Sequence, residues 1–157
     1  MPKFTPLTAR TETQTDGPCG PCSAILYSDS GGLDQFGAFV ETLAPGSRSS
    51  LRHWHAAEDE MVYMISGEAL VHEGDDTYPL LPGEAATFKA GAPAGHFLEN
   101  AGDGPVSYLV IGTRSGADTI TYPDHDRVLR FSRAGGKMAE RGFTTIGGAP
   151  AASPYDD

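Results

Sequence analysis

Several features that identify common functional classes are missing from these 157 residues. No apolar run approaches the roughly 18 residues that a membrane-spanning helix needs, and the segment Met-Pro-Lys-Phe-Thr at the start contains no hydrophobic signal region. Basic residues are also few, because 11 Lys and Arg face 21 Asp and Glu, which gives a formal net charge of -10. An acidic surface disfavours nucleic acids and anionic membranes. We therefore expect a cytoplasmic protein that binds neither.

Cysteine is equally scarce, since the chain contains only Cys19 and Cys22, in the tetrapeptide Cys-Gly-Pro-Cys. This spacing is that of thioredoxin-type redox motifs. In those motifs a helix follows and activates the thiol, but the segment that follows here is too short and too β-like to form that helix. A second cysteine pair that could complete a zinc site is absent. A phosphate loop, a dinucleotide fingerprint and a serine nucleophile elbow are absent as well. We interpret the tetrapeptide as a surface turn.

Glycine and proline, in contrast, are abundant, with 20 and 12 residues. They separate short apolar segments at intervals of roughly 8 to 12 residues, which is typical of a β-sandwich or barrel, and no window has the period of an amphipathic helix. We expect one all-β domain over residues 24–132, with an N-terminal arm before it and a Gly/Pro-rich tail over 133–157. Strands over 60–65 and 68–72 are expected to form a hairpin about Ser66-Gly67.

The stretch from His53 to Gly67 carries the clearest chemical signal. Side chains alternate along a strand, so His53 and His55 lie on one face and Trp54 on the other. A turn over residues 56–59 would return Glu60 beside the two imidazoles, with Glu58 and Asp59 solvated in that turn. Two imidazoles and a carboxylate suit a divalent metal such as iron, manganese, nickel or zinc.

A second motif follows some thirty residues later and completes a recognisable pattern. The chain resembles the cupin superfamily in two motifs, which here consist of Gly46, His53, His55, Glu60 and Gly67, and of Gly83, Ala90-Gly91, His96 and Asn100. The resemblance implies a double-stranded β-helix barrel of jelly-roll type. It also implies a metal centre made of His53, His55, Glu60 and His96, with Asn100 as a structural hydrogen-bonding residue.

The second motif departs from the family pattern in its bend. Lys89 stands where a proline often begins this bend, and the two residues before His96 lengthen it. The spacing from His96 to Asn100 is intact, so we expect His96 to reach the metal. Further segments of the chain resemble a bacterial subgroup of single-domain cupins that has no settled activity.

The surroundings of these ligands suggest a pocket. Val62 and Met64 share the parity of Glu60 and are expected to line it together with Phe88 and Leu98. Either Lys89 or Arg52, which flank the ligands, would offer a positive charge to an anionic substrate. Glu58, Tyr63 or a metal-bound water would act as an acid or base.

The resemblance leaves the activity open. It implies a divalent-metal-dependent enzyme acting on a small polar or acidic metabolite, by dioxygenase, isomerase, decarboxylase or lyase chemistry. The alternative is a non-catalytic barrel that binds a small molecule or sugar. Because both parities of the strand over residues 60–66 are largely apolar, both of its faces should be covered, which favours a homodimer.

Overall fold

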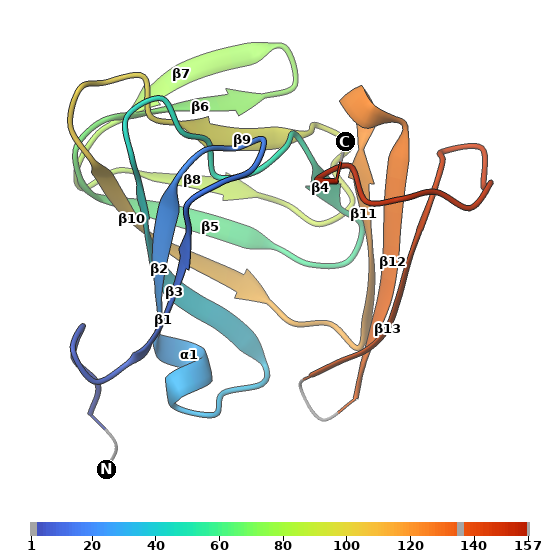
Figure 1. Cartoon of the computed structure of the whole chain (residues 1–157), viewed down its shortest axis with the longest axis horizontal. Coiled ribbons are helices and arrows are strands. Elements are labelled where there is room, and N and C mark those ends of the chain that lie inside the picture. The colour runs from blue at the N-terminus through green and yellow to red at the C-terminus, as the bar shows by residue number, and fades with distance from the viewer. Residues whose placement is uncertain (1–2, 135–136, 157) are drawn as a thin grey trace.

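The computed structural model describes residues 3–134 and 137–156, and its strands form three antiparallel sheets (Figure 1). Sheet A has the order β1-β2-β3-β10-β5-β8 and contains β1 (Arg10–Gln14), β2 (Cys22–Leu26), β3 (Phe36–Leu43), β5 (Glu60–Ser66), β8 (Ala85–Phe88) and β10 (Val106–Thr113). Sheet B has the order β7-β6-β9 and contains β6 (Ala69–Glu73), β7 (Asp76–Leu80) and β9 (His96–Glu99). Sheet C has the order β13-β12-β11-β4 and contains β4 (Trp54–His55), β11 (Ala117–Tyr122), β12 (Arg127–Ala134) and β13 (Lys137–Thr144).

Helical structure within the described ranges is limited to the single turns α1 (Tyr27–Ser30) and η1 (Pro123–His125). The prediction of an all-β chain is therefore confirmed. Neither turn, nor any other helix in the part of the chain that the structure describes, has the length and apolar character needed to cross a membrane.

Sheets A and B pack against each other around the main core. In β5 the inward side chains Val62 and Met64 are at most 1% exposed, whereas the outward Tyr63 and Ile65 are 42% and 47% exposed. The inward set packs with residues of sheet B such as Val71 and others in one apolar cluster. The expectation that both faces of this strand are covered is therefore not met within one chain.

The predicted hairpin about Ser66-Gly67 is wrong. Strand β5 pairs with β10 and β8, while β6 pairs with β7 and β9, so the chain crosses from sheet A to sheet B at this point. Gly67 has a φ of +77°, and a Cβ there would lie 2.7 Å from Val106. A two-sheet barrel needs this tight crossing, which local strand periodicity does not distinguish from a hairpin turn.

The two ends of the chain are more ordered than the sequence indicates. The expected loose N-terminal arm contains β1, which pairs with β2 along its whole length. In the Gly/Pro-rich tail, β13 forms the edge of sheet C beside β12. Beyond it Pro154 is fully buried, and the Tyr155 hydroxyl lies 3.3 Å from the backbone nitrogen of Leu51. Both ends therefore pack against the barrel.

Candidate metal centre

Three of the predicted ligands meet where sheets A, B and C approach one another. His53 forms an antiparallel bridge with His96, in which each backbone N–H donates to the other's carbonyl, at 3.3 and 2.8 Å. Glu60 is the first residue of β5. One side-chain donor atom from each of these three residues lies within 4.8 Å of the other two.

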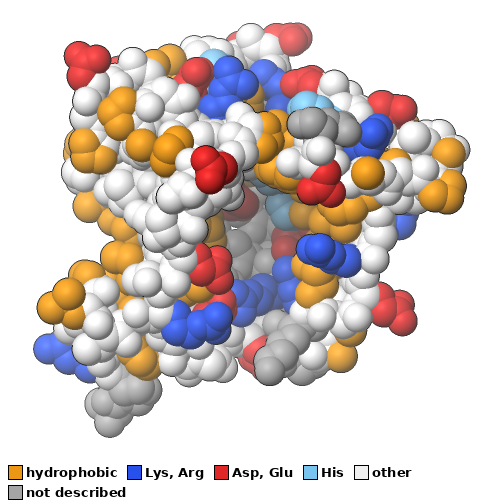
Figure 2. All heavy atoms as spheres, in the orientation of Figure 1, with side chains coloured by type: hydrophobic (Ala, Val, Ile, Leu, Met, Phe, Trp, Pro, Cys, Tyr) orange, Lys and Arg blue, Asp and Glu red, His pale blue; other side chains and the backbone are white. Residues whose placement is uncertain are grey.

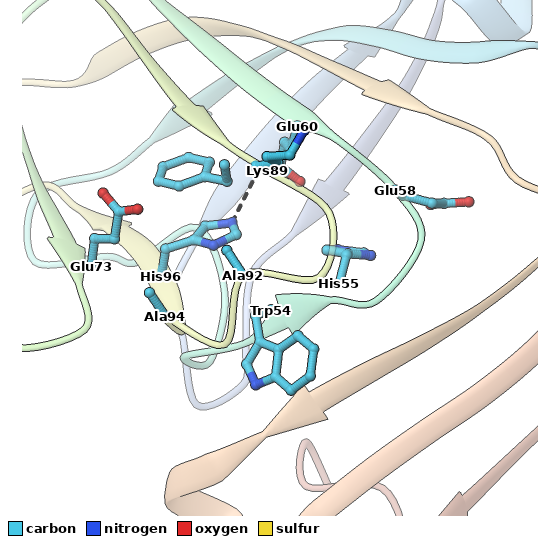
Figure 3. Close-up of a pocket in the computed structure, with 10 residues that line it drawn as sticks. Trp54, His55, Glu58, Glu60, Glu73, Lys89, Ala92, Ala94 and His96 are labelled. Atoms are coloured by element: carbon cyan, nitrogen blue, oxygen red, sulfur yellow. Dashed lines mark ion pairs between the residues drawn. The ribbon is translucent and has the colours of Figure 1, made fainter.

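His55, the fourth predicted ligand, lies beside this group. Its ring is edge-on to the ring of His53, with centroids 5.1 Å apart. His55, Glu60 and His96 line the small pocket drawn in Figure 3. The structure thus places the donor atoms of His53, Glu60 and His96 together and His55 beside them, and the position of His55 near His53 is that expected from strand alternation.

The histidines differ in how their rings are held. His53 Nδ1 lies 2.9 Å from the carbonyl oxygen of Leu51. A carbonyl only accepts hydrogen bonds, so this contact places the proton on Nδ1 and leaves Nε2 with a free lone pair. Burial, together with the charge of His96, lowers the pKa of His53 to about 4. His53 is therefore neutral at physiological pH, which is the form that binds a metal.

His96 is the most unusual of the three, because neither of its buried ring nitrogens has a hydrogen-bond partner in the described structure. The ring is held instead by Phe88, which stacks on it at a centroid distance of 3.6 Å. Its Nε2 lies 3.5 Å from Glu60 Oε1, within ion-pair distance. An unpartnered buried polar atom costs on the order of 1–3 kcal/mol, so its persistence indicates a missing partner.

Glu60 supplies the negative charge of the group. Burial acts to raise the pKa of this carboxyl, but the contact with His96 and the neighbouring His53 and His55 outweigh burial and lower the pKa overall. The donor set therefore consists of imidazole nitrogens and one carboxylate, which fits a borderline divalent cation.

A cavity of about 170 Å³ opens beside these residues. Of the four predicted pocket residues, Val62 and Leu98 line this cavity, and Phe88 lines the smaller pocket, which His96 also lines. Met64 is fully buried in the main core and does not line either space.

Glu41 on β3, which sequence analysis did not single out, lines the same cavity as His53 and Glu60. The Tyr108 hydroxyl donates a short hydrogen bond to the Glu41 carboxyl. Burial raises the pKa of Glu41 to about 7, against the opposing effect of the Tyr108 hydrogen bond. The same burial and the charge of Glu41 raise the pKa of Tyr108 well above its ordinary value. The signal in the sequence is weak: one acid in the inward parity of a strand, between Phe39 and Leu43.

On the other side of His55 lies a second cluster, formed by His55, Glu58 and Asp118, which are also within 4.8 Å of one another. Asp118 Oδ2 lies 2.6 Å from His55 Nδ1. Glu58 is 8% exposed and accepts hydrogen bonds from Ser115 and from the guanidinium of Arg133. The expectation of a solvated Glu58 is therefore wrong, because an arginine 75 residues later in the chain covers it.

The two cations considered as substrate anchors differ. Arg52 donates hydrogen bonds to the carbonyls of Gly74 and Gly95 and forms an ion pair with Asp124. Its charge is therefore already paired within the protein. Lys89 is exposed, lies beside Glu60 at the pocket, and has no recorded ion pair or hydrogen bond within the described ranges (Figure 3). Seen from outside, charged and histidine side chains line a hollow in the face of the molecule (Figure 2).

Tyr63 and the two cysteines lie apart from this chemistry. Tyr63 points outward from β5. The Cys-Gly-Pro-Cys segment forms a turn, as expected. It does not lie fully at the surface, because Cys19 is only 6% exposed. Both thiols are unpaired, and burial raises the pKa of each. They are therefore protonated and unreactive at neutral pH. The side-chain amide of Asn100 donates hydrogen bonds to the carbonyls of Leu43 and Gly104. This is the structural hydrogen-bonding role expected from the motif.

Comparison with known proteins gives a consistent result. The Cupin_2 model of the cupin domain matches residues 39–112. A sugar phosphate isomerase of the cupin superfamily from Silicibacter pomeroyi is 32% identical, with a TM-score of 0.84 over 98% of this chain and 99% of that one. A candidate sugar phosphate isomerase from Acidithiobacillus ferrooxidans is 29% identical, with a TM-score of 0.75 over 87% and 83% of the two chains. A Thermotoga maritima protein predicted to be an oxalate decarboxylase is 21% identical with a TM-score of 0.59, over 71% of this chain and 97% of that one, and shares the fold. No curated protein matches the chain.

Proposed function

Because this chain belongs to the cupin superfamily and has the fold of its double-stranded β-helix barrels, we propose that it is a metal-dependent isomerase of a small hydroxylated carbonyl compound. The observation that carries the proposal is that Glu41, His53, Glu60 and His96 line one cavity. That cavity combines the donors for a divalent cation with a separate carboxyl that titrates near neutrality.

The chemistry of an isomerase fits these groups. A divalent cation held by His53, His55, Glu60 and His96 would act as a Lewis acid toward the carbonyl and hydroxyl oxygens of the substrate. Glu41 takes the proton from the carbon beside the carbonyl and returns a proton to the former carbonyl carbon, while a hydroxyl proton moves to the carbonyl oxygen. No net oxidation occurs. A carboxyl with a pKa of about 7 is suited to both directions of proton transfer at neutral pH.

A phosphorylated sugar is the substrate class to test first. The Silicibacter pomeroyi and Acidithiobacillus ferrooxidans relatives carry this assignment. In this chain Lys89 supports the choice, because it is exposed at the smaller pocket, which shares Glu60 and His96 with the cavity, and no other described side chain pairs with its charge. Ammonium groups bind phosphate as point charges.

The test is turnover of a panel of short-chain aldose and ketose phosphates by protein loaded in turn with Fe²⁺, Mn²⁺, Ni²⁺ or Zn²⁺. We expect one pair of isomers to interconvert in deuterium oxide with deuterium entering the product at carbon. Glu41→Gln should lower kcat by about 10²–10⁴-fold while metal content is unchanged, and Glu12→Gln, on the exposed face of β1, should have no effect. Metal and substrate binding without turnover would contradict the isomerase and leave a non-catalytic sugar-binding barrel.

The molecule acts as a homodimer in this proposal, with the outer face of sheet A as the contact. Tyr63, Ile65 and Phe36 are 42%, 47% and 39% exposed on this sheet, and burying such side chains against a second copy removes apolar surface from water. Sedimentation velocity should give a dimer for the wild type and a monomer for Ile65→Lys. A monomeric wild type at micromolar concentration would refute this arrangement.

A further inference from the structure

Asp118, on β11 of sheet C, is a carboxylate outside the barrel motifs that contacts the predicted ligand His55. We propose that Asp118 fixes the tautomer of His55 and thereby makes His55 a metal ligand. The metal centre would then depend on β11, which lies outside the matched cupin domain at residues 39–112. The inference rests on the metal-binding part of the proposed function and is independent of the reaction.

The hydrogen bonds of Asp118 leave it only one orientation. Its side chain is fully buried. Oδ1 accepts from the backbone nitrogens of Ala57, at 2.8 Å, and Thr119, at 2.7 Å. Oδ2 is therefore directed at His55 Nδ1, 2.6 Å away, a distance typical of a charge-assisted hydrogen bond. A carboxylate only accepts, so the proton of the imidazole must reside on Nδ1.

This tautomer has a direct consequence for the metal. With the proton on Nδ1, the lone pair of His55 is on Nε2, the nitrogen that is left for a ligand role beside His53. A carboxylate behind a ligating histidine also increases the donor strength of the ring. His53 receives the same orientation from the carbonyl of Leu51, whereas His96 has no such partner within the described ranges. The Nδ1 atoms of the three rings thus have different surroundings, and that of His55 faces a carboxylate.

Replacing Asp118 with its isosteric amide reverses this arrangement. In Asp118→Asn the two backbone N–H groups of Ala57 and Thr119 keep the amide oxygen at the position of Oδ1, so the NH₂ group faces His55. An NH₂ group donates, and Nδ1 must then accept. The ring proton moves to Nε2 and occupies the lone pair that the metal needs. An Asp-to-Asn change behind a functional histidine is known to preserve geometry while imposing the wrong tautomer.

The experiment has two readouts. In metal-free protein, ¹⁵N shifts of the histidine rings should show His55 protonated at Nδ1 in the wild type and at Nε2 in Asp118→Asn. Competition with a chromophoric chelator should show about 10–100-fold weaker Zn²⁺ binding by the variant. Asp124→Asn is the matched control, because Asp124 is 60% exposed and contacts Arg52 rather than a ligand. Asp118→Glu, which retains the charge, should recover part of the affinity.

Several outcomes would overturn the inference. The inference is wrong if His55 in the metal-free wild type carries its proton on Nε2. This test needs no variant, so it does not depend on the folding of Asp118→Asn. The inference is also wrong if a folded Asp118→Asn protein binds Zn²⁺ with unchanged affinity. The failure of the isomerase proposal looks different: Zn²⁺ affinity then still depends on Asp118, but no sugar phosphate is converted.

Discussion

Two clusters meet at His55, and both place three potential ligands within 4.8 Å, yet their polar atoms are occupied in opposite ways. In the first cluster the ring nitrogens of His96 have no partner in the described structure, and Glu60 has only the 3.5 Å contact with that ring. In the second, Asp118 and Glu58 accept hydrogen bonds from His55, backbone N–H groups, Ser115 and Arg133. Proximity of histidines and carboxylates therefore does not by itself define a metal site. What distinguishes the first cluster is that the ring nitrogens of its ligand His96 lack hydrogen-bond partners in the described structure.

Arg133 makes the contrast electrostatic as well. Its guanidinium contacts Glu58 and lies over the ring of Phe131, 4.6 Å from the centroid. A fixed positive charge next to Glu58 neutralises that carboxylate and repels a second cation. We infer that the second cluster supports the first: Asp118 orients His55, and the Glu58–Arg133 pair ties sheet C to the turn before Glu60.

The largest effect is expected from removing a ligand of the first cluster. His96→Ala should weaken the affinity for Zn²⁺ or Mn²⁺ by more than roughly 100-fold, which is the upper effect of removing a residue that only hydrogen-bonds to a ligand. Elemental analysis after purification without chelator measures this loss. His72→Ala is the control, since the His72 Nε2 lies 2.8 Å from Glu99 on sheet B and its loss should leave metal content unchanged. Equal metal content in the two variants would remove the distinction between the clusters.

The opposite result is expected for Glu58→Ala, which should keep its metal and lose stability. Removing this carboxylate takes the charged acceptor from the Arg133 guanidinium, which keeps only the Ser115 carbonyl among its recorded acceptors, and leaves the backbone N–H of Ser115 unpaired. The cost should be about 3 kcal/mol in the free energy of unfolding, measured by urea denaturation of metal-free protein. Asp124→Asn breaks a surface pair and should cost at most about 1 kcal/mol. Loss of metal from a folded Glu58→Ala protein would show that Glu58 is a ligand rather than a support.

The sequence predicted part of the first cluster from local information, because the alternation His53-Trp54-His55 and a four-residue turn place Glu60 beside the two histidines. His96 was expected only from the resemblance to the second cupin motif. The fold class followed from turn residues at regular intervals. The hairpin about Gly67 was predicted wrongly because periodicity identifies strands but not their partners.

The second cluster could not be predicted in the same way, because it depends on contacts across long separations. Asp118 is 63 residues from His55, and Arg133 is 75 residues from Glu58. One trace of these residues exists in the sequence. Asp118 shares a parity with Ile120 and Tyr122, as Glu41 does with Phe39 and Leu43. A single acid among the apolar residues of an inward parity is costly to bury, so it is a sign of function that single-sequence analysis can use.

The smallest expected effect concerns Glu41, a carboxyl whose single recorded hydrogen bond, among the described residues, comes from Tyr108. Burial raises the pKa of Glu41 from 4.5 to about 7, so the folded state holds a proton that the unfolded chain releases between these values. Folding stability contributed by this proton is present below pH 4.5 and is lost as the pH rises toward 7.

Glu41→Gln removes that loss, because an amide stays neutral at every pH. Its stability relative to the wild type should therefore rise from about zero below pH 4.5 to on the order of 1–3 kcal/mol above pH 7. Thermal unfolding of metal-free protein at several pH values measures the difference. A pH-independent difference would mean that folding does not raise the pKa of Glu41. If the variant instead gains stability above pH 7 and loses turnover, Glu41 lowers the stability of the fold at that pH but is needed for proton transfer in the reaction.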